Sequence, residues 1–571
     1  MLSPKVSLKN TKLYIVIFFV SVAFLVIILR LAYIQLYGRT SYIERIAEKF
    51  PKVTVERVPV YRGAIKDRNG TELAISLPTL SIFAFPQFVK NKEELARRLS
   101  AVLDQNEGEI LKKLNSDKKF VWLAKQVEKD HINYIKGVIR DTGNQSAVGL
   151  QEDYKRVYPH GYLASNLIGF VGAEGKGLEG IEYMLDDKLY SKEVKKVFLY
   201  SPKGGRMALS LEEEEIDFKT KDIYLTIDFG VQAILEDLKE KIVKDWRPRR
   251  VALIVIDLNS GDILGIANFP DYDPNKFRNY PHQNRRNYAV TDLFEPGSVV
   301  KPFFVGKALD KGYINFNYVV DTERGRAEFF GRVIRDVHPY DRLSVDQVII
   351  KSSNIGTAKI ARFLSKKDVE ELFKNIHFYS SFGVLPGEIK PKLPNLNYPA
   401  NIIYASIGQG LAVNLLNLCV AFGGLANNQI VKPRIIYEPN RPKTVLIDGL
   451  FSEKVINWLR KNLIKVVEEG TAVSAKSDYF TIAGKTGTAQ KFDTKTGKYS
   501  MEKVVAYFVG YFPATNPRFV AGIMVDEPRG RAFGGTAAAP YFKELVERVA
   551  FYERLEPDKT NKLSSYEAIK N

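Results

Sequence analysis

The sequence predicts an α+β protein with one membrane-spanning helix, a mixed α/β region after it, and a larger C-terminal domain built on an antiparallel sheet. Three observations predict this class. An apolar run follows three lysines near the N-terminus, two apolar strands flank an Asn-Ser-Gly turn at 259–261, and amphipathic helical segments separate further strands. The 571 residues are 45% hydrophobic and 26% charged, as expected of a folded chain with a sizeable core.

Composition narrows the function classes. The formal net charge of +18 suits a membrane surface or an anionic polymer. The sequence does not indicate a nucleic-acid partner, because it has no zinc-ligand cluster, no run of Lys and Arg alone and no aromatic RNA-binding signature. Cys419 is the single cysteine, so an intrachain disulfide is excluded, and an extracytoplasmic location is allowed but not indicated.

The anchor is predicted from the run Leu13–Leu29, in which Ser21 is the one polar residue, and from its continuation after Arg30 to Leu36. These 24 positions can cross a hydrocarbon core of about 30 Å. The lysines before the run place the short N-terminus in the cytoplasm and the rest of the chain outside. A cleaved signal peptide is the alternative, but the run is long for one and no small-residue cleavage site follows. We therefore expect an uncleaved single-pass anchor.

The region from about 40 to 220 mixes strands and charged helices. Residues 62–70 indicate two strands joined by an Asn-Gly hairpin turn, and strand character continues through 73–84. Amphipathic helices are expected at 92–106 and 107–114, and a further helix opens at 177–182. Because no metal-ligand spacing or phosphate loop occurs here, we interpret this region as a spacer or docking platform.

The C-terminal domain is predicted from 221 onward. Its expected elements are a strand at 223–228, a helix at 229–243, paired central strands at 250–258 and 262–268, a helix at 343–350, an edge strand at 480–490, strands at 504–513 and 518–526, and a closing helix at 541–552.

The residues that predict chemistry begin with Ser298, which follows a Pro-Gly turn and precedes an apolar helical run. A helix N-terminus favours developing negative charge there. Lys301 lies one turn further on the same face, and burial would lower its pKa enough for a neutral amine to take the serine proton. Alone, this pattern also fits a capping serine followed by a surface lysine.

Two further motifs follow in order. Ser352-Ser353-Asn354 indicates a loop between helices that offers a hydroxyl and an amide to a cleft, although a helix cap has the same pattern. Lys485-Thr486-Gly487-Thr488 lies on the expected edge strand, where Gly484 and Gly487 would allow a ligand to approach the backbone. A Walker A loop is excluded, because Tyr479 stands at its first glycine position and no helix is expected after it. Ser-x-x-Lys, Ser-x-Asn and Lys-Thr-Gly in this order are shared by penicillin-binding proteins and serine β-lactamases.

Over residues 13 to 550 the chain resembles a class B penicillin-binding protein, a monofunctional peptidoglycan D,D-transpeptidase, and most of all the septal, cell-division type. The elongation-specific type is the close alternative. Bifunctional relatives carry a glycosyltransferase signature, but Arg156 and Pro159 replace its Phe and His here, so we expect no such activity. The resemblance rests on Arg62-Gly63, Asp67–Gly70, Gly177–Glu182, Leu225–Asp228 with Gln232, Asp273–Asn275, Glu295–Lys301, Ile334–His338, Ser352–Gly356, Gly408–Gly410, Lys485–Gln490, Val509–Pro513, Gly534-Gly535 and Ala539-Pro540.

The resemblance implies a cytoplasmic tail at 1–12, an anchor at 13–36, an elongated mixed α/β pedestal or dimerisation-like domain at 37–220, and a polar C-terminal tail at 553–571. Between the pedestal and that tail, residues 221–552 would form a transpeptidase domain with the fold of serine β-lactamases. It would consist of an antiparallel sheet flanked by helices and, in addition, an all-helical subdomain. The catalytic domain would lie in the periplasm, anchored in the inner membrane. Its implied partners are stem peptides ending in D-Ala-D-Ala, β-lactams, a polytopic glycosyltransferase and other divisome membrane proteins. No metal or organic cofactor is implied.

The resemblance also implies residue roles. Ser298 would be the nucleophile and Lys301 its base, Ser352 would relay the proton and Lys485 would raise the positive potential. Backbone N–H groups of Ser298 and Thr488 would form the oxyanion hole. Asn354 would hold the substrate backbone, and Thr486 and Thr488 with Gly487 would bind its carboxylate end. A D,D-carboxypeptidase or β-lactamase, a β-lactam sensor and a structural division protein remain as alternatives.

Overall fold

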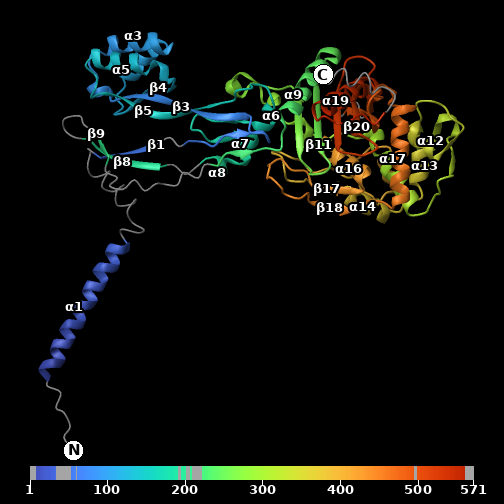
Figure 1. The fold of residues 1–571 in the computed structure, drawn as a ribbon, viewed down its shortest axis with the longest axis horizontal. Coiled ribbons are helices and arrows are strands. Elements are labelled where there is room, and N and C mark those ends of the chain that lie inside the picture. Colours follow the sequence, from blue (N-terminus) through green and yellow to red (C-terminus); the bar gives the residue numbers. More distant parts are fainter. Residues whose placement is uncertain are drawn as a thin grey trace, which may run out of the picture. The chain divides into compact units, whose positions relative to one another are not determined.

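The computed structural model describes residues 8–33, 53–58, 61–190, 194–200, 206–208, 221–493 and 498–559. The chain forms two compact units (Figure 1). Unit 1 comprises residues 1–61, 76–155 and 190–220, and unit 2 comprises 62–75, 156–189 and 221–571. Parts of the predicted cytoplasmic tail (1–7), anchor (34–36) and C-terminal tail (560–571) lie outside the described residues.

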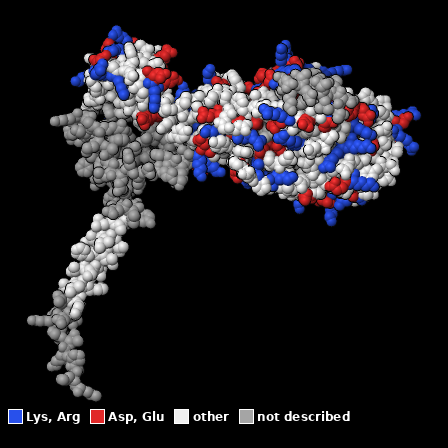
Figure 2. Space-filling model, viewed as in Figure 1, with Lys and Arg blue, Asp and Glu red and all other residues white. Residues whose placement is uncertain are grey.

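Helix α1 (Leu8–Tyr33) includes residues 13–33 of the anchor predicted at 13–36. Its segment Tyr14–Tyr33 is long and apolar enough to cross a membrane, and its large apolar side chains are exposed. In Figure 2 the described part of this helix is uncharged over most of its length, whereas Lys, Arg, Asp and Glu are interspersed over the visible face of unit 2. By its length and composition this segment is a candidate membrane span.

Unit 1 packs three helices on part of a sheet. Strands β3 (Glu72–Ala84), β4 (Val121–Val127) and β5 (Val148–Val157) lie together, with β3 pairing both β4 and β5. The helices are α3 (Lys92–Leu103), α4 (Glu107–Leu114) and α5 (Ile132–Asp141), which confirms the two amphipathic helices predicted at 92–114. Their apolar faces share one core with the strands, including Leu99, Ile110 and Leu123. A second sheet joins β1 (Val53–Val58), β8 (Val194–Tyr200) and β9 (Arg206–Ala208).

Unit 2 is organised by a five-stranded antiparallel sheet in the order β12-β11-β21-β20-β19. The predicted strand pair at 250–268 is confirmed, but β12 is an edge strand and not a central one. Its residues are buried all the same, because α9 (Phe229–Trp246) packs against it, so its composition matches that of a central strand. The strands are β11 (Arg250–Asp257), β12 (Ile263–Phe269), β19 (Ala483–Asp493), β20 (Lys498–Phe512) and β21 (Phe519–Asp526).

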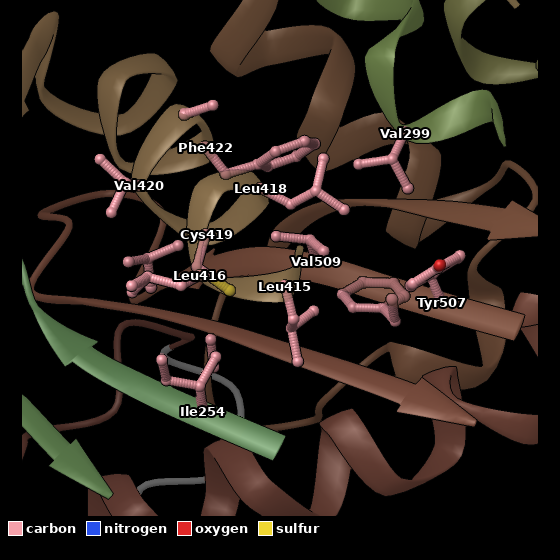
Figure 3. Packing of buried hydrophobic residues seen from close by; sticks show 14 of the residues in the cluster. Ile254, Val299, Leu415, Leu416, Leu418, Cys419, Val420, Phe422, Tyr507 and Val509 are labelled. Atoms are coloured by element: carbon pink, nitrogen blue, oxygen red, sulfur yellow. The ribbon is translucent and has the colours of Figure 1, made fainter. Parts of the chain in front are cut away.

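Helices cover both faces of this sheet. On one face α19 (Ala539–Tyr552) packs beside α9, and the rings of Phe508 and Phe542 have centroids 4.3 Å apart. On the other face α16 (Leu415–Asn427) directs Leu415, Cys419 and neighbouring apolar side chains at Ile254 and Val509 (Figure 3). A Cβ at Gly522 would lie 2.5 Å from the Cys419 sulfur, so the sheet needs glycine there for α16 to approach.

A helical subdomain completes unit 2 and borders β19. It includes η6 (Gly297–Val300), α11 (Lys301–Asp310), α12 (Val345–Ile350), α13 (Asn354–Ala361), α14 (Lys366–Asn375), α15 (Pro399–Ser406) and α17 (Glu453–Glu468). Two antiparallel ladders accompany these helices: β13 (Val319–Asp321) with β16 (Arg342–Ser344), and the hairpin β14 (Arg326–Phe329) with β15 (Arg332–Arg335).

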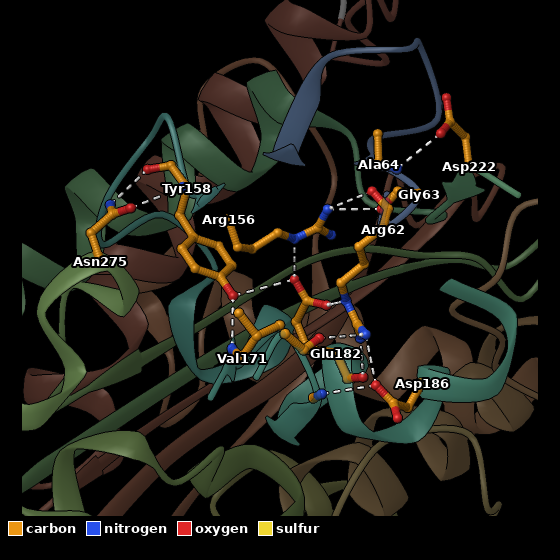
Figure 4. Close-up of polar contacts among 12 residues, drawn as sticks. Arg62, Gly63, Ala64, Arg156, Tyr158, Val171, Glu182, Asp186, Asp222 and Asn275 are labelled. Atoms are coloured by element: carbon orange, nitrogen blue, oxygen red, sulfur yellow. Dashed lines mark hydrogen bonds and ion pairs between the residues drawn. The ribbon is translucent and has the colours of Figure 1, made fainter. Parts of the chain in front are cut away.

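A buried ion cluster ties residues 62–75 and 156–189 into unit 2 (Figure 4). Glu182 lies on α7 (Gly180–Met184) and is fully buried. Its carboxylate accepts hydrogen bonds from the guanidinium groups of Arg62 at 2.6 Å and of Arg156 at 2.7 Å. Arg62 also binds Asp186 at 2.7 Å. Nearby, Asp67 accepts from the backbone N–H of Phe229 at 3.1 Å, at the start of α9. The predicted pedestal therefore contributes two segments to the unit that carries the sheet.

Several predicted boundaries need correction. The strand expected at 223–228 is shorter and comprises only β10 (Ile223–Tyr224). After it, the Thr226 hydroxyl hydrogen-bonds to two backbone carbonyls, and Asp228 caps the N-terminus of α9. The helix expected at 343–350 begins at Val345, after a Ser344 cap. The strand expected from 480 begins at Ala483, and the one expected from 504 begins at Lys498.

Candidate active site

Ser298 lies in η6, the single turn that leads into α11, and its side chain is partly exposed. Gly297, with φ of +55°, lets this turn press against β19: a Cβ there would lie 2.9 Å from the Thr488 carbonyl oxygen. The backbone of Ser298 is therefore placed beside that of Thr488, at the start of a helix whose dipole favours negative charge.

Lys301 is fully buried. Its Nζ donates to the carbonyl of Ser352 at 2.5 Å and to Oδ1 of Asn354 at 2.6 Å, and it lies 3.3 Å from Ser352 Oγ. Burial lowers the pKa of Lys301 to about 7, although the negative charge of Asp336 acts against this shift. A neutral amine with both N–H bonds directed at acceptors keeps one lone pair, which can accept a proton from a hydroxyl.

Ser352 lies in the short connection between α12 and α13, in a left-handed conformation with φ of +58°. Left-handed backbone is strained for a residue with a side chain, and such strain is concentrated at functional sites. Lys485 Nζ donates to Ser352 Oγ at 2.9 Å. Burial and the neighbouring Lys301 hold the pKa of Lys485 well below its usual range. The Ser352 hydroxyl thus lies between two lysines of low pKa.

The β19 segment forms one wall of the site. Thr486 Oγ1 lies 3.0 Å from Thr471 Oγ1, and Thr488 Oγ1 accepts from the N–H of Gly534 at 3.0 Å. An accepting hydroxyl can still donate its own proton, so Thr488 remains able to bind an anion. Gly487 also leaves room for the turn that carries Ser298, because a Cβ there would meet the Pro296 carbonyl at 2.8 Å; its expected contact with a ligand stays a prediction.

Asp336 has a place in the site that the sequence did not reveal. Following β15, it accepts from the Ser353 hydroxyl at 2.6 Å and from the N–H groups of Asn354 and Ile355 at 2.5 and 3.0 Å. The neighbouring carbonyl of Arg335 accepts from Asn354 Nδ2 at 2.7 Å. These contacts fix the loop that carries Asn354. The available signal was its place in the Ile334–His338 motif, but no spacing along the chain relates this aspartate to α13.

The structure brings Lys301, Ser352, Asn354 and Lys485 into one hydrogen-bonded group and packs the Ser298 turn against Thr488. A partly exposed hydroxyl, a neutral buried amine and nearby backbone donors are the groups needed for acyl transfer through a covalent serine ester.

Comparisons with known proteins place this site in a family. Residues 251–547 match the model of the penicillin-binding protein transpeptidase domain, and residues 57–215 match that of the penicillin-binding protein dimerisation domain. The probable peptidoglycan D,D-transpeptidase PenA of Neisseria gonorrhoeae is 33% identical over 92% of this chain and 91% of its own. The peptidoglycan D,D-transpeptidase FtsI of Escherichia coli K12 is 30% identical over 93% of this chain and 91% of its own.

Solved structures show the same fold. A peptidoglycan synthetase from Bifidobacterium adolescentis is 22% identical and covers 89% of this chain and 98% of its own, with a TM-score of 0.68. The transpeptidase domain of penicillin-binding protein 3 from Burkholderia pseudomallei is 31% identical, covering 58% of this chain and 97% of its own, with a TM-score of 0.53.

Proposed function

The chain belongs to the class B penicillin-binding proteins and is a peptidoglycan D,D-transpeptidase, and from this membership we propose that Ser298 is its nucleophile and Lys301 its general base. The observation that carries the proposal is the burial of Lys301, which lowers its pKa to about 7 beside Ser352 and Asn354. A lysine with its ordinary pKa would stay protonated at neutral pH and could not accept the serine proton.

The proposed reaction runs in two steps. Ser298 Oγ forms a bond to the carbonyl carbon of the penultimate D-Ala while its proton passes to Lys301. The C–N bond to the terminal D-Ala breaks, and the proton reaches the departing amine through Ser352, which lies between Lys301 and Lys485. The amine of a second stem peptide then attacks the ester carbonyl carbon, the C–O bond to Ser298 breaks, and the proton that the amine loses returns to Ser298 Oγ through Lys301, which leaves an amide cross-link.

The remaining residues bind and orient. The N–H groups of Ser298 and Thr488 would stabilise the oxyanion, for which a single donor contributes roughly 3–4 kcal/mol. Asn354 would hold the donor peptide backbone, with its own position fixed by Lys301 and Asp336. Thr486 and Thr488 would bind the terminal carboxylate through their hydroxyl groups, and Lys485, whose pKa is lowered by burial and by Lys301, would hold the Ser352 hydroxyl.

Fluorescent penicillin tests this assignment. Wild-type protein should be labelled covalently, and a single modified peptide should contain Ser298, whereas Ser298→Ala should not be labelled. Slow loss of the label supports a transpeptidase. Rapid hydrolysis of the drug would instead indicate a β-lactamase, and an adduct on another side chain would refute the nucleophile.

We also propose a septal role, supported by the likeness to FtsI and PenA over nine-tenths of each chain. In this proposal residues 1–12 lie in the cytoplasm, α1 spans the inner membrane, and the transpeptidase domain (221–552) lies in the periplasm. The anchor and residues 37–220 would bind a polytopic glycosyltransferase and other division proteins. Depletion in the native host should give filaments with unfinished septa, and rounded cells would instead indicate the elongation-specific role.

A further inference from the structure

The hairpin β14–β15 places two arginines directly opposite each other. In its antiparallel register Arg326 pairs with Arg335, and both side chains are exposed. The opposite face of the hairpin is buried through Ala327, Phe329 and Ile334, so the strands are held against the core. Like charges at directly opposed positions destabilise a strand pair. The arrangement is therefore unfavourable for the hairpin unless an anion lies between the two guanidinium groups.

Three acidic side chains near the hairpin have other partners. Asp336 accepts from the Ser353–Ile355 segment, Asp341 pairs with Arg324 at 3.2 Å, and Glu323 pairs with Lys359 at 2.6 Å. Glu328 shares the exposed face, where its register partner is Val333. Within the described part of the chain, neither Arg326 nor Arg335 takes part in an ion pair.

The arginine pair is continuous with the active site. The backbone carbonyl of Arg335 accepts from Asn354 Nδ2 at 2.7 Å, and Asn354 Oδ1 accepts from Lys301. Asn354 is the residue proposed to hold the donor peptide backbone. An anionic group carried on that peptide, a few bonds from the section held by Asn354, would therefore come within reach of these two side chains.

We propose that Arg326 and Arg335 form a subsite for a carboxylate on the donor stem peptide, upstream of its D-Ala-D-Ala end. The proposal rests on the function proposed above. A carboxylate has two oxygens that match the planar donor fork of arginine, and one carboxylate between two guanidinium groups relieves their repulsion. The pair thereby selects donor peptides with a free acid over those in which the acid is amidated.

Two synthetic peptides test the subsite: acetyl-Glu-Lys-D-Ala-D-Ala and acetyl-Gln-Lys-D-Ala-D-Ala, which differ by one charge. The full-length protein in detergent is labelled with fluorescent penicillin, and each peptide is titrated as a competitor. An exposed ion pair changes an equilibrium by about two- to fivefold. Two pairs should make the Glu peptide compete roughly four- to twenty-fivefold better, and about 1 M salt should remove most of this preference.

The variants are Arg326→Gln, Arg335→Gln and the double change, with Arg324→Gln as the matched control. Each single change should reduce the preference for the Glu peptide about two- to fivefold, and the double change should abolish it. Arg324→Gln removes the same charge from the same segment but should keep the wild-type preference. Because the arginines repel each other, the single variants should melt no lower than wild type, which distinguishes a binding role from a structural one.

Equal competition by the two peptides in wild type would overturn the subsite, as would a preference that survives in the double variant. A loss of preference in Arg324→Gln equal to that in Arg326→Gln would also overturn it, because general charge would then explain the effect. Failure of wild type to react with penicillin at Ser298 would instead overturn the proposed function, so the two failures are distinguishable.

Discussion

Replacing Asp336 by asparagine separates two effects of this carboxylate on the active site. It positions the Ser353–Ile355 segment through three accepted hydrogen bonds, and its negative charge raises the pKa of Lys301 against the effect of burial. Asp336→Asn keeps the shape of the side chain. With the remaining oxygen on the N–H groups of Asn354 and Ile355, the new NH₂ group faces the Ser353 hydroxyl, which can accept from it, so the contacts persist without their charge assistance.

The positional effect should dominate. Hydrogen bonds to charged groups contribute about 1.5–3 kcal/mol and neutral ones about 0.5–1.5 kcal/mol, so the weakened hold on this segment is expected to slow acylation by penicillin roughly tenfold. The effect on charge acts in the other direction but is limited. Lys301, with a pKa of about 7, is roughly half neutral at pH 7, so a lower pKa can gain at most about twofold in reactive lysine.

The sign of the pH effect follows from the same contacts. A nearby carboxylate stabilises protonated Lys301, and removing its charge therefore lowers the pKa of the lysine further. Acylation of the wild type should rise as pH increases through about 7, the pKa of Lys301. In Asp336→Asn the rise should occur at lower pH, with a lower plateau.

The assay is the second-order rate constant for acylation by fluorescent penicillin between pH 5 and about 9, the range that brackets a pKa of about 7. Asp341→Asn is the matched control, because Asp341 lies five residues away in sequence, is exposed and pairs with Arg324. It should retain both the rate and the midpoint of wild type. A midpoint that moves up in Asp336→Asn, or a plateau equal to wild type, would refute the reasoning.

The other predictions concern stability, packing and reactivity. Glu182→Gln removes the carboxylate that Arg156 and Arg62 share, leaving Arg62 with Asp186, and should lower the free energy of unfolding by about 3–5 kcal/mol in urea titrations, whereas Asp186→Asn, at a partly exposed partner, should cost less than half as much. Gly487→Ala places a methyl group 2.8 Å from the Pro296 carbonyl, so penicillin acylation should fall at least tenfold while the melting temperature drops by a few degrees; unchanged acylation would contradict this contact. Cys419 is buried, and burial raises the pKa of its thiol, so a maleimide should label it in urea but not in the native protein.

The local pattern of apolar residues was sufficient to predict several of the main helices and strands. The apolar run predicted α1, the nearly continuous apolar and β-branched residues on both sides of Asn259-Ser260-Gly261 predicted β11 and β12, and helical periodicity predicted α3 and α4. The order of three short motifs then indicated the family, which the comparisons confirm. Each of these elements, and each motif taken singly, can be recognised in the sequence because it depends on residues within about one turn or one strand of each other.

The sequence by itself determined the residue types of the site and their order, but the tertiary structure decided their chemistry. Lys301 has a low pKa because separate segments enclose it, and Asp336 controls Asn354 from the end of a hairpin 18 positions earlier. The two arginines became opposed only through the register of β14 and β15. Desolvation and charge–charge energies depend on distances in space, and no spacing along the chain specifies them.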